Sequence, residues 1–145
     1  TEEPGKNYVL PFGKANYVIR GDSLTIICWG AMVQKSVEAA QQTSKSDNII
    51  EIIDLRTLNP IDYDTIKDSI SKTGKVLVVY EDNLTNGPGA ELCSVIADRY
   101  FEYLDGPVKR VASKDSPVPY NWFLEDDVLV QVSDISNAIK ELLEY

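Results

Sequence analysis

Residues 49–62 read IIEIIDLRTLNPID, and this stretch indicates the fold class. Its first seven residues are almost continuously apolar, which is typical of a strand that is covered on both faces of a sheet. The turn-forming segment 59–62 follows and ends in Asp62, which predicts the N-cap of a helix over 63–71. A buried strand that leads through a turn into a helix is the repeating unit of an α/β protein.

The same alternation continues on both sides of this stretch. Apolar runs predict further strands at 15–20, 23–29, 75–80 and 108–113. Apolar faces of helical period predict helices at 31–43 (with Val33, Val37 and Ala40 inward), at 90–101 and, capped by Ser133, at 133–144. Loops are expected at 44–48 and 81–89, and irregular chain at 117–127. This order predicts an α/β domain whose mostly parallel sheet has helices on both faces.

Length and charge restrict the classes of protein that remain. The 145 residues suit one domain, and the formal net charge of -9 argues against a nucleic-acid partner, which clustered Lys and Arg would bind. No apolar run approaches the roughly 20 residues that span a bilayer, so we expect no membrane segment. Thr1 is not followed by a signal-peptide pattern.

Cysteine and histidine usage narrows the chemistry. Cys28 and Cys93 are far apart and lie in apolar stretches, which predicts two buried free thiols in a reducing compartment. The chain has no histidine, so a Ser-His or Cys-His hydrolase cannot be built from it alone.

A glycine-containing segment at 83–92 (NLTNGPGAEL) leads from a predicted strand into a predicted helix. A phosphate cradle has a broadly similar form, but this segment lacks the GxxxxGK[ST] and GxGxxG spacings. We therefore favour a tight turn that glycine permits over a nucleotide site.

Acidic groups elsewhere are better explained by structure than by catalysis. Glu81 and Asp82 end a predicted strand, where neighbouring side chains diverge to opposite faces, so a structural or interface role is favoured. Asp54 and Arg56 share a face, which predicts a local ion pair. The acidic run 125–127 offers oxygen ligands for a cation, but a solvated loop is the favoured interpretation.

Five motifs in order resemble the C-terminal domain of the transketolase superfamily, most closely that of the beta subunits of pyruvate and branched-chain 2-oxoacid dehydrogenases. They are LPFGKA (10–15), TIICWG (25–30), IDLRTLNPID (53–62), EDNLTNGPGAEL (81–92) and LDGPVKRVASKDSPVP (104–119). Two features depart from the family pattern. Tyr80 stands where many members have histidine, and the segment 87–89 (GPG) replaces a Gly-Gly-Phe-Gly-like run.

The resemblance implies a three-layer α/β/α fold with a five-stranded mixed sheet whose first strand is antiparallel. It also implies that 15–145 form this domain and that 1–14 are a linker from an N-terminal pyrimidine-binding domain outside this sequence. In the family, thiamine diphosphate and magnesium bind between the alpha subunit and that N-terminal domain. No catalytic, cofactor-binding or metal-binding residue is therefore expected within this chain.

The resemblance further implies partners. The family domain contacts the alpha subunit and a second beta subunit, and it helps to dock the small, basic subunit-binding domain of the acyltransferase. The matching positions are Asp105 and the C-terminal carboxylate of Tyr145, and the net charge of -9 suits a basic partner. The intact enzyme would decarboxylate a 2-oxoacid and acylate a lipoyl group, whereas the isolated domain is expected to be inactive.

Two alternatives stay open at this point. One is the same domain of another thiamine enzyme, such as a deoxyxylulose-phosphate synthase, which shares part of the Asp-Leu-Arg and Pro-Asp pattern. The other is an independent flavodoxin-like module that holds a nucleotide at its strand ends. A reducing compartment, cytoplasmic or the matrix of a mitochondrion or other organelle, is expected for the 2-oxoacid dehydrogenase.

Overall fold

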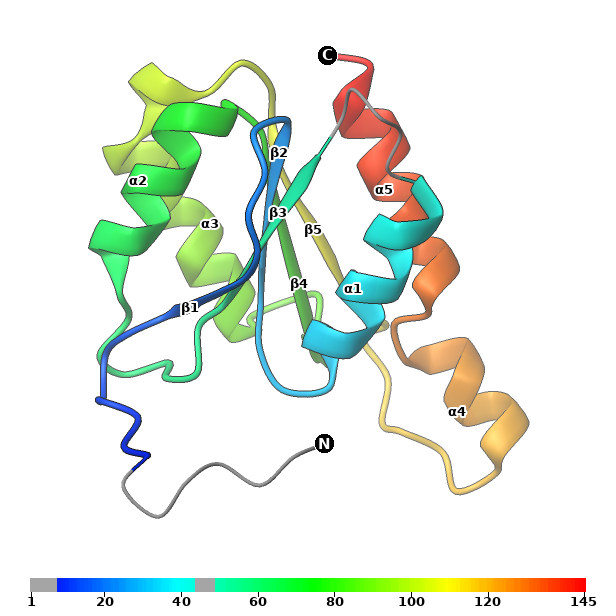
Figure 1. The fold of residues 1–145 in the computed structure, drawn as a ribbon. Coiled ribbons are helices and arrows are strands. Elements are labelled where there is room, and N and C mark those ends of the chain that lie inside the picture. Colours follow the sequence, from blue (N-terminus) through cyan, green and yellow to red (C-terminus); the bar gives the residue numbers. More distant parts are fainter. Residues whose placement is uncertain (1–7, 44–48) are drawn as a thin grey trace.

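A single mixed sheet organises the chain, for which the computed structural model describes residues 8–43 and 49–145 (Figure 1). The sheet runs in the order β1-β3-β2-β4-β5. β1 is antiparallel to β3, and the other neighbouring pairs are parallel, which confirms the expected five-stranded mixed sheet. The strands are β1 (Asn16–Ile19), β2 (Leu24–Cys28), β3 (Ile50–Asp54), β4 (Val76–Asn83) and β5 (Val108–Ser113).

Helices cover both faces of this sheet and complete the three layers (Figure 1). One face carries α1 (Met32–Thr43) and α5 (Val132–Leu143), and the other carries α2 (Tyr63–Thr73) and α3 (Pro88–Arg99). The short 3-10 helix η1 (Phe101–Tyr103) follows α3, and α4 (Trp122–Val128) lies beyond the sheet near the carboxyl ends of the parallel strands (Figure 1).

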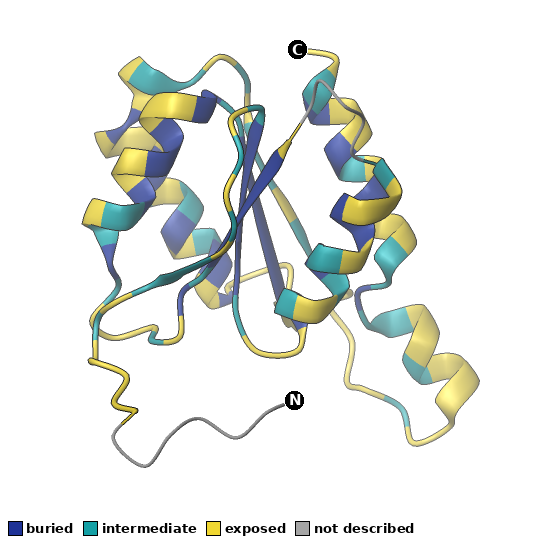
Figure 2. Cartoon of the chain, viewed as in Figure 1, coloured by how far each residue is buried: buried dark blue, intermediate teal, exposed yellow. Residues whose placement is uncertain are grey.

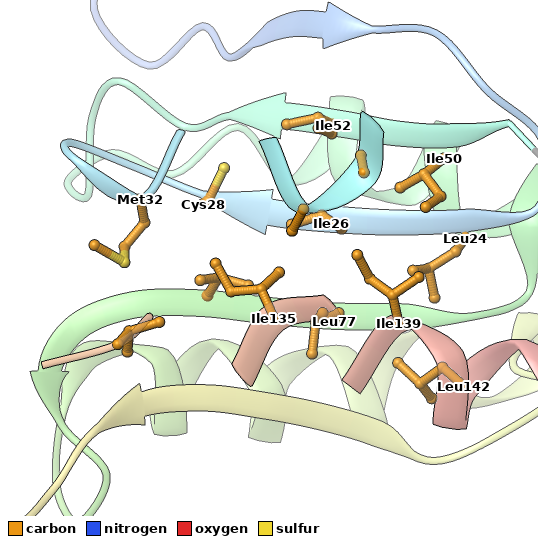
Figure 3. Close-up of a cluster of buried hydrophobic side chains, with 14 residues drawn as sticks. Leu24, Ile26, Cys28, Met32, Ile50, Ile52, Leu77, Ile135, Ile139 and Leu142 are labelled. Carbon is orange, nitrogen blue, oxygen red and sulfur yellow. The ribbon is translucent and has the colours of Figure 1, made fainter. Parts of the chain in front are cut away.

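Two hydrophobic clusters, one on each face, hold the layers together. All five residues of β2 are buried, and the outward faces of the helices are exposed (Figure 2). Figure 3 shows the cluster under α1 and α5, where Ile135 and Ile139 lie against the sheet. Cys28 belongs to this cluster and Cys93 packs against the other one, so the two free thiols lie on opposite faces. Burial raises the pKa of Cys28 to about 12 and that of Cys93 to about 11.

The inward face of α1 differs from the prediction. Ala40 is buried as predicted, but Val33 and Val37 are only half-buried, and the helix buries Met32, Ser36 and Ala39 in their place. The two valines still pack on the edge of the cluster. The small residues allow α1 to approach both the sheet and α5 closely, so the face of closest packing is not the most hydrophobic one.

After β5, the segment before the last helix and the cap of that helix differ from the prediction, whereas the helix itself is confirmed. Residues 122–128 form α4 in place of irregular chain, because the Asn121 side chain accepts a hydrogen bond from the Phe123 N–H at 3.0 Å and caps the helix. The last helix is capped by Gln131 and not by Ser133, in a capping box completed by Asp134.

Strand β4 runs on to Asn83, into the loop that was predicted at 81–89. The loop predicted at 44–48 lies outside the described residues.

A buried carboxylate fastens α2 to the sheet. Glu51 in β3 has no exposed side-chain surface, and it accepts hydrogen bonds from the Ser69 hydroxyl and from the Gly21 N–H at 3.1 Å. Lys72 pairs with it at 2.5 Å while keeping 42% of its own side chain exposed. Because an unpaired buried charge is costly, these contacts tie α2 and the turn before β2 to β3.

We expect Lys72→Met to lower the free energy of unfolding by about 2 kcal/mol, because Glu51 loses its cation while remaining buried. This loss of stability is smaller than that expected on breaking a fully buried ion pair, because the Lys72 side chain is partly exposed to solvent. Lys140→Met is the matched control, since Lys140 is an exposed lysine in the last turn of α5, and it should cost less than about 0.5 kcal/mol. Equal effects in urea denaturation would contradict this account of Glu51.

Asp62 confirms the predicted helix cap and also anchors the start of β1. It accepts hydrogen bonds from the Thr65 N–H at 3.3 Å, the Thr65 hydroxyl at 2.9 Å and the Ala15 N–H at 3.0 Å. Burial pushes the pKa of Asp62 upward, but these hydrogen bonds and Lys14 outweigh burial, so the pKa lies below its ordinary value. The ionised form therefore stabilises the fold.

Asp62→Ala should lower the free energy of unfolding by about 2 kcal/mol at neutral pH, because α2 loses its cap. A lowered pKa in the folded state means that this stabilisation is present above the unfolded value of about 3.9 and is lost as pH falls through the folded value. The difference between the two proteins should therefore narrow below about pH 4. Asp64→Ala, at an exposed position in the same helical turn, should cost less than about 1 kcal/mol and serves as the control.

Candidate functional site

Asp105 is held in place at the amino end of the parallel strands. It lies between η1 and β5, is exposed, and donates its backbone N–H to the Gly74 carbonyl at 2.7 Å. Gly74 is the left-handed C-cap of α2, with φ 67°. A Cβ on Gly74 would lie 2.1 Å from Asp105 Oδ2, so the carboxylate rests directly on the glycine. The backbone hydrogen bond therefore fixes this loop at the end of α2, where the exposed Asp105 carboxylate lies over Gly74.

Tyr145 lies at the same end of the molecule as Asp105. A Cβ on Gly106 would meet Tyr145 Cβ and Cγ at 3.4 Å, so the tyrosine packs against the residue next to Asp105. Tyr145 keeps 64% of its surface exposed, and with Glu141 and Glu144 it lines a hollow of about 350 Å³. The structure thus brings the two candidate partner-binding positions together.

Several carboxylates lie at this end of the molecule. Glu141 forms an ion pair with Lys109 of β5. Within residues 8–43 and 49–145, no ion pair neutralises Asp105 or Glu144. Glu141 and Glu144 were not among the predicted site residues. Glu141 lies in the last turn of α5 and Glu144 directly precedes Tyr145, so both lie beside Tyr145. Exposed carboxylates grouped in this way attract a cationic surface.

The glycine segment that follows β4 packs against an aromatic ring and not around a phosphate. A Cβ on Gly87 would lie 2.7 Å from the Tyr80 ring, and a Cβ on Gly89 would lie 2.1 Å from it. Tyr80 is fully buried, stacks on Trp29 with ring centroids 5.6 Å apart, and has a pKa that burial raises. The glycines are therefore needed for space beside Tyr80.

The remaining acidic candidates converge on no common site. Asp54 does not pair with Arg56 as predicted; Asp54 Oδ1 accepts the Arg56 N–H at 3.0 Å instead, while Arg56 adopts the left-handed backbone with φ 58°. Asp82 accepts from the Asn83 N–H at 2.7 Å, and the Glu81 side chain is exposed. In the part of the chain that the structure describes, no three His, Cys, Asp or Glu residues lie close enough to hold a metal ion.

The acidic run 125–127 lies in α4 and not in a loop. Asp127 pairs with Lys114 at 2.9 Å, and both side chains are exposed. This pairing is a surface contact that contributes little stability. None of the helices in residues 8–43 and 49–145 combines the length and hydropathy that a membrane crossing requires.

The architecture defines a class: a three-layer α/β/α domain built on a five-stranded mixed sheet. The profile of the family described as "Transketolase, C-terminal domain" matches residues 13–135. The chain belongs to the transketolase C-terminal domain family.

Curated relatives are similar over nearly the whole chain. The pyruvate dehydrogenase E1 component subunit beta of Rickettsia bellii is 42% identical over 134 residues, which are 92% of this chain and 41% of that protein. The mitochondrial protein of the same name from Dictyostelium discoideum is 37% identical and covers 99% of this chain and 40% of its own length. The Staphylococcus aureus protein is 40% identical, with coverage of 99% and 44%. This chain spans less than half the length of these relatives.

Solved structures share the fold. One described as "Split gene transketolase, inactive beta4 tetramer" superposes with a TM-score of 0.80 at 23% identity, over 99% of this chain and 46% of that one. Transketolase from Leishmania mexicana gives a TM-score of 0.58 at 16% identity, over 91% of this chain and 18% of its own. These similarities support the expected architecture independently of the sequence motifs.

The contact between Gly74 and Asp105 predicts unequal costs for two similar substitutions. Gly30→Ala should cost about 1–2 kcal/mol, because Gly30 has φ 59° but nothing lies within 4 Å of its added Cβ. Gly74→Ala meets the same backbone strain and also displaces the exposed Asp105 side chain, which can rotate away, so the contact should add no more than about 1 kcal/mol in thermal or urea unfolding.

Asp105→Ala provides the internal check on this difference. In that background, Gly74→Ala should cost about as much as Gly30→Ala, because the clashing carboxylate is gone. An undiminished cost would show that Asp105 does not rest on Gly74.

Proposed function

We propose that this chain is the C-terminal assembly domain of the beta subunit of a thiamine-diphosphate-dependent 2-oxoacid dehydrogenase. The observation that carries the proposal is the grouping of exposed Asp105, Tyr145 and neighbouring carboxylates at one end of the domain. The relatives named pyruvate dehydrogenase E1 component subunit beta support the choice among thiamine enzymes over a deoxyxylulose-phosphate synthase.

In this proposal the chemistry belongs to the complete enzyme. The intact assembly would decarboxylate a 2-oxoacid and pass the acyl group to a lipoyl acceptor, as an oxidoreductase of a multienzyme complex. The described residues do not fit a magnesium-diphosphate group, since they include no suitable cluster of acidic ligands. In this proposal, thiamine diphosphate and magnesium would be held by the alpha subunit and by an N-terminal domain, to which residues 1–14 would be the linker.

The partners follow from the same proposal. An alpha subunit and a second beta subunit would complete a heterotetramer, and the acyltransferase subunit-binding domain would dock at Asp105 and the Tyr145 carboxylate. A basic docking domain matches the charge of this end. Two free thiols suit the reducing cytoplasm or organellar matrix in which such an enzyme would work.

We expect Asp105→Ala to weaken docking of the subunit-binding domain by more than about tenfold, which corresponds to about 1.4 kcal/mol. The measurement is calorimetry on the complete heterotetramer at two salt concentrations, because the docking site would form across two beta subunits. A small loss that disappears at high salt would place Asp105 on the rim of the site.

Asp98→Ala is the control for general charge loss, since Asp98 is an exposed carboxylate on α3. It should leave the affinity unchanged within about twofold, and 2-oxoacid decarboxylation should be normal in both variants. Unchanged affinity for Asp105→Ala at both salts would remove Asp105 from the docking site. Turnover by the 145-residue chain alone, with thiamine diphosphate and magnesium added, would contradict the assignment of catalysis to other parts of the enzyme.

A further inference from the structure

Within the described residues, the outer edge of β5 has no paired strand. β5 is the last strand of the sheet and has one neighbour, β4. Its pairing with β4 is regular from Val108 to Val111, and no backbone hydrogen bond outside the sheet reaches residues 108–112 from the described chain. The opposite edge is β1, which has only four residues and an irregular register. Regular open edges are templates for a further strand, whereas short or irregular ones are not.

An apolar groove runs beside this edge on the α3 face of the sheet. The groove, called the α3–β5 groove below, has a volume of about 480 Å³. Its walls include Cys93, Ser94 and Ala97 of α3 and Val108 and Arg110 of β5. Most of the lining is apolar. Ser94 and Ala97, on the α3 side of the groove, are exposed to solvent. A groove between a helix and an open strand edge can accept the alternate side chains of an added strand.

Arg110 is the positively charged side chain among the residues that line this groove. The Arg110 Nη1 donates to the Leu84 carbonyl at 2.7 Å and lies 3.4 Å from the Tyr80 hydroxyl. Arg110 forms no ion pair with a carboxylate of the described chain, although it is near enough to Asp115 to help lower the pKa of that group. The neighbouring Lys109 points to the other face, where it pairs with Glu141. A guanidinium beside an apolar surface favours an occupant with one carboxylate.

We propose that the α3–β5 groove binds an extended peptide segment of a partner protein, which adds a strand to β5. The segment would carry an apolar side chain in the groove and one acidic residue at Arg110. A strongly acidic segment is disfavoured by the net charge of -9. A second copy of this chain is also disfavoured, because an isologous β5–β5 pair would bring Lys109 and Arg110 of both copies together and would add two negatively charged molecules.

The probe is a displayed library of random peptides of about seven residues, the length of a typical strand. Selection on the 145-residue chain should enrich peptides with β-branched or aromatic residues next to a single Asp or Glu. The best peptide is then synthesised together with its Gln or Asn counterpart. Amide hydrogen exchange should show new protection within Val108–Ser113 when the peptide binds. Failure to enrich any such peptide, or protection elsewhere, would overturn the proposal.

Two variants test the groove itself. Ala97→Phe fills the α3–β5 groove and should reduce peptide affinity by at least about tenfold. Ala31→Phe makes the same change at an exposed alanine outside the groove and should change it by less than about twofold. Circular dichroism should show that both variants fold. Equal effects of the two variants would contradict binding in the groove.

Arg110→Gln tests the charge contact. It should weaken binding of the acidic peptide by at least about fivefold and that of the neutral peptide by less than about twofold. Equal losses for the two peptides would overturn the carboxylate contact. If sedimentation instead shows a dimer of the chain that Ala97→Phe dissociates, the occupant is a second copy and not a partner peptide.

Discussion

A parallel sheet needs a covering layer on each face, because its central strands have no side that faces water. In β2 every residue is buried, and the strand lies between β3 and β4 with a hydrophobic cluster above and below it. This constraint sets the positions of α1 and α5 on one face and of α2 and α3 on the other. It also explains why Glu51, a fully buried carboxylate in the neighbouring strand β3, is surrounded by partners: a charge in a covered strand cannot be solvated by water.

The elements that local sequence determines were predictable. Residues 49–55 are recognisable as a buried strand because their side chains are apolar, and Asp62 is recognisable as a cap because its main bonds are to Thr65, three residues away. The partners of Glu51 are 18, 21 and 30 residues away, so no local pattern indicates them. The helix α4 was missed because its apolar residues are exposed and its cap is a single asparagine.

The candidate site illustrates a similar division. Asp105 and Tyr145 were identified through a family resemblance, and no feature of composition or spacing marks them. The close approach of Gly74 to the Asp105 carboxylate depends on how α2 ends relative to β5, which is a tertiary relationship. The two departures from the family pattern, Tyr80 and the segment 87–89, lie in contact, and the glycines at 87 and 89 leave the space that the Tyr80 ring fills.

Because the two thiols lie on opposite faces of the sheet, their reactivities report separately on the opening of the two helical layers. Cys28 is fully buried on the α1–α5 face, and Cys93 is half-buried on the α2–α3 face. A thiol reagent reaches Cys28 when the layer above it lifts, whereas Cys93 reacts during smaller fluctuations at the surface. The ratio of the two labelling rates therefore distinguishes motion of one helical layer from cooperative loss of the whole structure, without any introduced probe.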